Sequence, residues 1–442
     1  MSSPPPSLLR ALLPAGQAPG VTAVRARLEA AGAEVTLRGT DCCAEGRWAL
    51  DVRFEEQAFE LWMAPSPGGL EGHLQTAAGV SLPEATIEAA EASDFCLALA
   101  TRFEAHPLRE LHRQLRLLAA AAPDAVLLLD ESACTARSGA WLREVAAAST
   151  PPSPRALYAV HCVYDEHGVW VHTHGLGRCG TLEVEMLDVP RERLPCLGPL
   201  VHAVAAQWIE QGPPPPCAPF SAGRDIELVW VPAERAVAKR KPRGPGGAAD
   251  RDEAHARPSG VLLVPEGWSV KRYRCPSSLA PILEGNPMLY LSRMETERMA
   301  LLAAERLGRF AALQARFGER EGWRFLVKLG YPITDADAGA NLRAGGCGAR
   351  ASEEAAGQDA ADAEAAGEAR EHLWFDVHAV EGDRVEATLL NAPYHVPTLA
   401  CGDRGWHDLA LLSDWVVLGP HGQYGPDAIH ALEDAVAERP DA

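Results

Sequence analysis

Strand-like alternation is clearest in the stretch that reads Glu371-His-Leu-Trp-Phe-Asp-Val-His378. Its Leu, Phe and Val recur at every second position, which places them on one face of a β-strand. Similar short segments follow at Glu386–Tyr394, Gly402–Trp406 and Ser413–Val417. Short strands bounded by Gly, Pro, Asn and Asp predict a small β-rich module, which we place at residues 371–435.

Upstream of this module the pattern predicts two further domains in which helices and strands alternate. Helical spacing is strongest over residues 107–122, where leucines recur every three or four positions. The proline-rich stretch Thr150–Pro154 marks a boundary. We therefore expect an N-terminal α+β domain at 7–149 and a second α+β domain at 150–338.

The second domain is expected to end with a long helix and a strand. Ser292-Arg-Met-Glu295 matches a capping box, and the helix it opens should run to Phe317. A strand is expected at Trp323–Tyr331. Residues 339–370 are Gly-rich, then acidic and Ala-rich, which is typical of a disordered or weakly helical linker. The predicted class is α+β and multi-domain, with mixed or antiparallel sheets and packed helices.

The charge balance narrows the classes of partner. The chain has 41 Lys and Arg against 60 Asp and Glu, a formal net charge of −19. Such a surface repels phosphate backbones, so we expect no nucleic acid as a partner. The sequence shows no signal peptide and no segment near the roughly 20 apolar residues of a membrane span, so we expect no membrane contact. The 11 cysteines form no Cys-x-x-Cys pair, which indicates free thiols in a cytoplasmic protein.

One hairpin carries the strongest chemical signal. Two strand-like runs, Leu157–Tyr164 and Val169–His174, flank a short polar turn. If the turn centres on residues 166 and 167, His161 faces His172 across the hairpin. His172 and His174 share a face because side chains alternate along a strand. Three imidazoles on one face predict a zinc site with an open fourth position.

A ligand or a base for this site could come from Cys179 or Glu183, which follow the hairpin closely. Cys162 should lie on the opposite face from the histidines. A structural interpretation stands beside the metal one, because histidines in half-buried sheets often bond carbonyls or carboxylates. No His-Glu-x-x-His motif supports a metal site, so this interpretation, with no cofactor, is favoured.

The β-rich module is unusually aromatic. Trp374, Tyr394, Trp406 and Trp415 could form an exposed surface that binds a protein partner. They could instead fill the core of a small β-module, since large rings bury most of their area. We favour the core.

Two groups of residues resemble bacterial families of unknown function. The C-terminal pattern resembles the domain of unknown function 2314 (YegJ-like), through Glu371-His-x-Trp374, Asn391-x-Pro-Tyr394, Gly402-Asp403 and Asp414-Trp415. The upstream region is similar to the domain of unknown function 4026, through Pro152–Pro154, Leu157-Tyr158, His172–Leu176, Arg178, Gly180, Glu183, Arg251-Asp-Glu-x-His255, Asn286-Pro287 and Phe325–Pro332. The resemblance implies a soluble bacterial protein, with residues 345–370 as an insertion, and assigns no catalytic residue.

Two functions remain open on these grounds. The favoured one is a non-enzymatic protein that binds another macromolecule, most simply another protein, in an immunity- or stress-associated role. The rival is a metal-dependent hydrolase that uses His161, His172 and His174.

Overall fold

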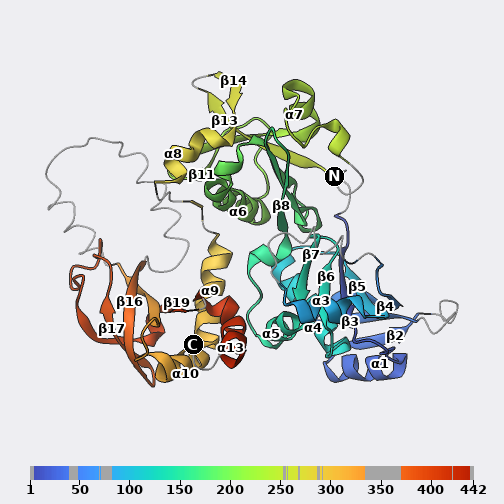
Figure 1. The fold of residues 1–442 in the computed structure, drawn as a ribbon, viewed down its shortest axis with the longest axis horizontal. Coiled ribbons are helices and arrows are strands. Elements are labelled where there is room, and N and C mark those ends of the chain that lie inside the picture. The colour runs from blue at the N-terminus through green and yellow to red at the C-terminus, as the bar shows by residue number, and fades with distance from the viewer. Residues whose placement is uncertain are drawn as a thin grey trace. The chain divides into compact units, whose positions relative to one another are not determined.

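The computed structural model describes residues 4–438 except 39–47, 69, 71–81, 252–254, 256, 267–268, 286–288, 291, 334–369 and 421. The chain divides into two compact units, Met1–Glu295 and Thr296–Ala442. Helices and strands both contribute to each unit, and the three sheets are mostly antiparallel (Figure 1). The predicted α+β, multi-domain class is therefore confirmed. No helix in the described ranges has the length and apolar character needed to cross a membrane.

The first sheet of unit 1 has the strand order β2-β3-β4-β5-β1-β6-β7. Its strands are β1 (Ser7–Leu12), β2 (Glu34–Leu37), β3 (Ala49–Phe54), β4 (Gln57–Pro65), β5 (Phe95–Thr101), β6 (Leu127–Asp130) and β7 (Thr135–Ser138). Its helices are α1 (Val21–Ala30), α3 (Glu84–Glu91), α4 (Pro107–Ala121) and α5 (Gly139–Ala147). The predicted helix at 107–122 is confirmed by α4, whose leucine face packs into the core with α1 and α5.

The second sheet of unit 1 has the order β11-β12-β13-β10-β9-β8, and β14 pairs with β13. Its strands are β8 (Ala159–Tyr164), β9 (Val169–His174), β10 (Glu183–Val189), β11 (Phe220–Gly223), β12 (Ile226–Pro232), β13 (Ser259–Glu266) and β14 (Ser269–Arg274). One pair, β10 with β13, is parallel. Helix α6 (Leu194–Gln211) packs on one face, and α7 (Ala233–Arg240) packs on the other.

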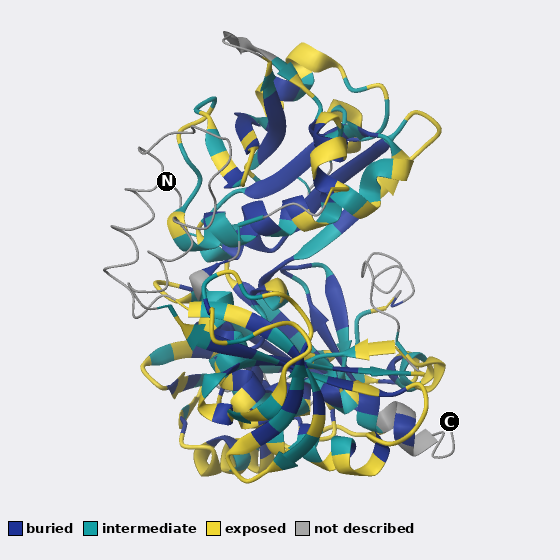
Figure 2. Cartoon of the chain, turned by 90° about the vertical axis from the view of Figure 1, so that its left-hand side faces the viewer, coloured by how far each residue is buried: buried dark blue, intermediate teal, exposed yellow. Residues whose placement is uncertain are grey.

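A buried ion pair joins the two sheets of unit 1. Arg178, which is fully buried, donates two hydrogen bonds to Asp130 at the end of β6, at 2.9 and 2.8 Å. The same guanidinium donates to the carbonyl of Leu157 at 2.8 Å. Removing one member of such a pair leaves a buried uncompensated charge, at a cost of about 3–5 kcal/mol. The predicted domains 7–149 and 150–338 thus share buried contacts, and one hydrophobic core runs through both sheets of unit 1. Figure 2 shows the buried residues following the strands.

Unit 2 is built on a sheet with the order β18-β17-β16-β15-β19-β20. Its strands are β15 (Arg324–Pro332), β16 (Arg370–Glu381), β17 (Arg384–Leu389), β18 (Arg404–Asp408), β19 (Leu412–Gly419) and β20 (Gly422–Tyr424). The helices α10 (Leu307–Phe317) and α13 (Ile429–Glu438) contribute Phe310, Leu313, Phe317, Ile429 and Leu432 to the core on one face of this sheet.

Two expectations for the segment before the acidic stretch need correction. The single long helix is two helices, α9 (Arg293–Glu305) and α10, separated at Arg306, whose backbone leaves the helical conformation. The strand at 324–332 does not close the second domain, because it pairs with β16 and β19 of the C-terminal sheet. Its partners lie beyond the acidic stretch in sequence, so no local pattern reveals the pairing. Of the expected linker at 339–370, only Arg370 lies inside the described residues.

Candidate metal centre

The hairpin β8–β9 has the register that the sequence predicted. His161 faces His172, and Ala159 faces His174, across an antiparallel pair. One ring nitrogen from each of the three histidines lies within 4.8 Å of the others. The ring centroids of His161 and His174 are 4.7 Å apart, and those of His172 and His174 are 4.9 Å apart. The structure therefore brings together the three residues proposed as ligands.

The cluster is enclosed by the fold. His172 is 3% exposed, His174 is 7% exposed and His161 is 9% exposed. The histidines lie on the face of the second sheet that is opposite α6. On the neighbouring strands β12 and β13, the same face carries Val229, Val231, Val261 and Leu263. Polar rings thus stand where β12 and β13 place aliphatic side chains, and such rings need partners inside the protein.

His161 has a bare ring nitrogen inside the protein. Its Nε2 is buried and has no hydrogen-bond partner. The backbone of Cys134, in the turn between β6 and β7, raises the pKa of the ring, but burial lowers that pKa more. When the proton lies on Nδ1, Nε2 presents a lone pair that a metal ion can take.

His172 also has one ring nitrogen without a partner and one in contact with a neighbour. Its Nδ1 is buried and without a partner, whereas its Nε2 lies 3.2 Å from Nε2 of His255. The indole of Trp170 stacks on the His172 ring with 4.0 Å between centroids and 30° between planes. The ring is therefore fixed from its Nε2 side and from one face, and Nδ1 is left bare.

Burial keeps the imidazoles of His161 and His172 neutral. It lowers the pKa of His172 to about 2, and the neighbouring His174, His255 and His161 lower it further. Burial also lowers the pKa of His161. A metal ion binds the neutral imidazole, so no proton must be removed near neutral pH before these two rings can bind.

The carboxylates closest in sequence are already engaged. Glu183 accepts hydrogen bonds from Thr173 Oγ1 at 2.7 Å and from the amides of Gly175 and Gly177 at 3.0 and 2.9 Å. Glu185 faces His172 in the register. It accepts two bonds from Arg251, at 2.8 and 2.6 Å, and one from Trp170 Nε1 at 2.9 Å. Neither carboxylate is placed to act as a free base.

Cys179, which was suggested for the site, does not join the three histidines. Burial raises the pKa of the Cys179 thiol to about 12, and its Sγ lies 4.0 Å from the carbonyl oxygen of Gly175. Cys162 is exposed and pairs with Val171 on the face away from the histidines, as expected. Among the residues that the structure describes, the group able to hold a metal consists of the three histidines.

His255 is a fourth histidine beside the cluster, which the sequence did not single out. It appeared only within the family motif beginning at Arg251, with no sign of a role. It comes from the segment before β13, and its ring lies against both His172 and His174, with centroids 4.8 and 5.0 Å apart. No spacing rule links a residue so distant in sequence to the hairpin, so only the fold could reveal it.

The four aromatic residues of unit 2 divide between core and surface. Trp415 is fully buried and donates from Nε1 to the carbonyl of Ala303 at 3.0 Å, so the core interpretation holds for it. Tyr394 is 73% exposed and Trp406 is 37% exposed. Trp374 is partly buried, with Lys328 Nζ 5.7 Å from its ring centre. The four residues therefore do not form one surface.

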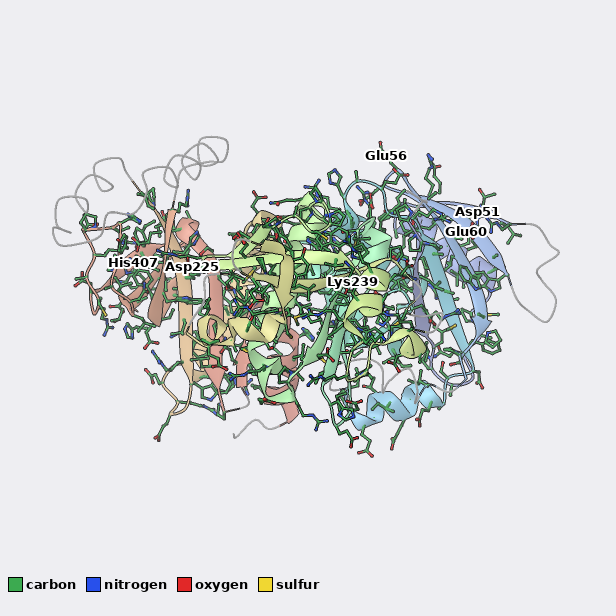
Figure 3. The ribbon with its side chains drawn as sticks, turned by 90° about the horizontal axis from the view of Figure 1, so that it is seen from above. Asp51, Glu56, Glu60, Asp225, Lys239 and His407 are labelled. Atoms are coloured by element: carbon green, nitrogen blue, oxygen red, sulfur yellow. The ribbon has the colours of Figure 1, made fainter. Side chains whose placement is uncertain are left out.

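Exposed carboxylates on the first sheet of unit 1 form ordinary ion pairs. Asp51 and Glu60 lie on the paired strands β3 and β4 (Figure 3). Both contact Arg38, at 3.1 and 2.8 Å. All three side chains are about half exposed. Pairs of this kind contribute little to stability, and nothing about this one indicates a ligand site.

Three family models match the chain. The model described as "Protein of unknown function (DUF4026) N-terminal" matches residues 20–152, and the model for the C-terminal part of DUF4026 matches residues 160–263. The model described as "Uncharacterized protein conserved in bacteria (DUF2314)" matches residues 354–441. These matches confirm the resemblance found in the motifs, and all four clustered histidines fall within the second range. No curated protein and no solved structure matches the chain.

Proposed function

The chain belongs to the DUF4026 family and carries a DUF2314 domain, and the descriptions of these families assign no reaction. We therefore propose a function from the geometry of unit 1. The protein binds a transition-metal ion, and zinc is the ion that we propose. The ligands are His161, His172 and His174. The observation that carries the proposal is the pair of bare nitrogens, His161 Nε2 and His172 Nδ1, buried in one cluster.

The physical argument concerns unpaired polar atoms. A buried acceptor without a partner costs about 1–3 kcal/mol, and two in one cluster of rings are unusual in a folded protein. A bound cation would give each of them a partner. His172 is also kept neutral by its surroundings, which is the form that a metal requires.

Zinc suits this donor set best. Three imidazole nitrogens with one open position form a known arrangement for zinc, with Zn–N distances of about 2.0–2.1 Å. Imidazole also binds copper and nickel, so those ions are the competitors to test. Magnesium and calcium prefer oxygen ligands and fit poorly.

The residues around the three histidines favour a protein that binds the metal ion over one that uses it for hydrolysis. A metal-dependent hydrolase needs an open coordination position and a group that moves a proton. The described carboxylates beside the cluster, Glu183 and Glu185, are both committed to hydrogen bonds. The hydrolase therefore takes second place to a metal-binding role. An immunity- or stress-associated role, with a protein partner, stays a prediction that no described contact tests.

Elemental analysis of the full-length, tag-free chain tests the proposal. We expect about one zinc per chain, and loss of that zinc in the His172→Ala and His174→Ala variants. His167→Ala is the matched control, because His167 lies in the turn of the same hairpin with its side chain 57% exposed. A wild-type chain that retains no zinc, copper or nickel after incubation with each ion would show that the proposal is wrong.

A further inference from the structure

We propose, on the basis of the metal binding proposed above, that His255 is a positioning residue which accepts the His172 Nε2–H and so directs Nδ1 of His172 to the metal. His255 itself is not a ligand in this arrangement. Nothing in the two family descriptions assigns it a role.

The proton count at the contact carries the argument. The two Nε2 atoms are 3.2 Å apart, so a hydrogen bond between them needs one donor and one acceptor. If His255 donated, the proton of His172 would sit on Nδ1, which is buried and has no acceptor. If His172 donates, its Nδ1 carries a lone pair. Only the second arrangement leaves no buried N–H unsatisfied and provides a ligand atom.

His161 has a bare nitrogen as well. Its Nε2 is buried and has no hydrogen-bond partner. Metal-binding histidines usually have an outer partner that fixes which ring nitrogen is bare, and for His172 that partner is His255.

Two described residues on either side of His255 in sequence, Arg251 and Ser259, contact the same sheet. Arg251 forms its two bonds with Glu185, and its guanidinium lies 5.3 Å from the centre of the Trp170 ring. Ser259, at the start of β13, also donates to Glu185. The Trp170 ring in turn lies 4.8 Å from that of His255. These contacts tie Arg251 and Ser259 to β9 and β10, the strands that carry Trp170 and Glu185.

A competing assignment makes His255 a fourth ligand. Two nitrogens bound to one tetrahedral zinc at about 2.0–2.1 Å lie roughly 3.3 Å apart, which is near the observed separation. In that case His172 would bind through Nε2, and its Nδ1 would need a different partner. The two assignments predict different responses to replacement of His255.

The experiment compares His255→Ala and His255→Gln in the full-length chain, with His167→Ala as the control. Metal affinity is measured by competition with a chelator, and the cobalt(II) absorption spectrum reports the number and geometry of ligands. The amide oxygen of Gln can accept from His172 Nε2–H. We expect Ala to weaken affinity about 10–100-fold with an unchanged cobalt spectrum, and Gln to recover most of the loss.

Three results would overturn the inference. Affinity unchanged in His255→Ala would show that the contact does not orient His172. A changed cobalt spectrum without rescue by Gln would make His255 a ligand. Absence of metal from the wild-type chain would show that the proposed metal binding itself is wrong. That outcome is distinct from the other two, which concern His255 alone. Circular dichroism of each variant establishes that the fold is retained.

Discussion

At the scale of single residues, the candidate site depends on which ring nitrogens lack a partner and not only on which residues are histidines. The sequence placed His161 opposite His172 correctly, because a short turn fixes the register of a hairpin. It could not show that His161 Nε2 and His172 Nδ1 are bare, because that depends on residues from other parts of the chain, such as His255 beside His172. Local pattern thus predicts which side chains meet, and tertiary structure decides which of their atoms are available.

Another residue-scale consequence concerns Asp414 in unit 2. Burial raises the pKa of this carboxyl from 3.8 to about 6, and the residue is 8% exposed. A carboxyl with a higher pKa in the folded chain binds its proton more tightly there. Unit 2 should therefore gain stability from this group as the pH falls from 7 to about 4, and lose it as the pH rises through 6. The difference is at most about 3 kcal/mol, at 1.36 kcal/mol per pKa unit.

Asp414→Asn should remove this contribution. The variant keeps an oxygen that can accept from the Trp415 amide, as Asp414 does at 2.8 Å. We expect its free energy of unfolding to exceed that of the wild type at pH 7.5 and to match it near pH 4, as measured by urea denaturation of residues 296–442. Asp408→Asn, at an exposed residue of β18, is the control. Equal pH dependence in the Asp414 variant and the wild type would contradict the account.

At the scale of elements, β15 shows where sequence reasoning fails. The alternation at 324–332 correctly predicted a strand, but its position in the chain suggested the wrong sheet. β15 pairs along most of its length with β16 on one side and β19 on the other, and so occupies the middle of the C-terminal sheet. Alternation reports that a strand exists, whereas its neighbours follow from packing far along the chain.

Fragments of the chain test this assignment. A fragment of residues 371–442 lacks β15, so β16 and β19 would each lose their common neighbour and expose unpaired backbone. We expect it to be unfolded or aggregated, and a fragment of residues 296–442 to fold with a cooperative melting transition. Circular dichroism and amide-proton dispersion in NMR spectra distinguish these outcomes. A folded 371–442 fragment would show that the β-rich module predicted to begin at residue 371 is an autonomous domain.

At the scale of the whole molecule, the two compact units have separate cores and carry different features. Every proposed ligand, and His255, belongs to unit 1, whereas Asp414 belongs to unit 2. The net charge of −19 favours encounter with cations over encounter with polyanions. Alternation and helical spacing were enough for the α+β class, and the resemblance of short motifs was enough for the family. They did not reveal that the two upstream domains are joined through the buried Arg178–Asp130 pair, which links residues remote in sequence.

X-ray absorption spectroscopy of the full-length chain loaded with zinc is the most direct test of the proposed metal centre. We predict a first shell that contains three imidazole nitrogens at about 2.0–2.1 Å, and loss of the imidazole scattering in His172→Ala. A first shell with a sulfur near 2.3 Å would place the ion on cysteine instead. That result, or a spectrum identical to that of zinc in buffer, would contradict a site built from His161, His172 and His174.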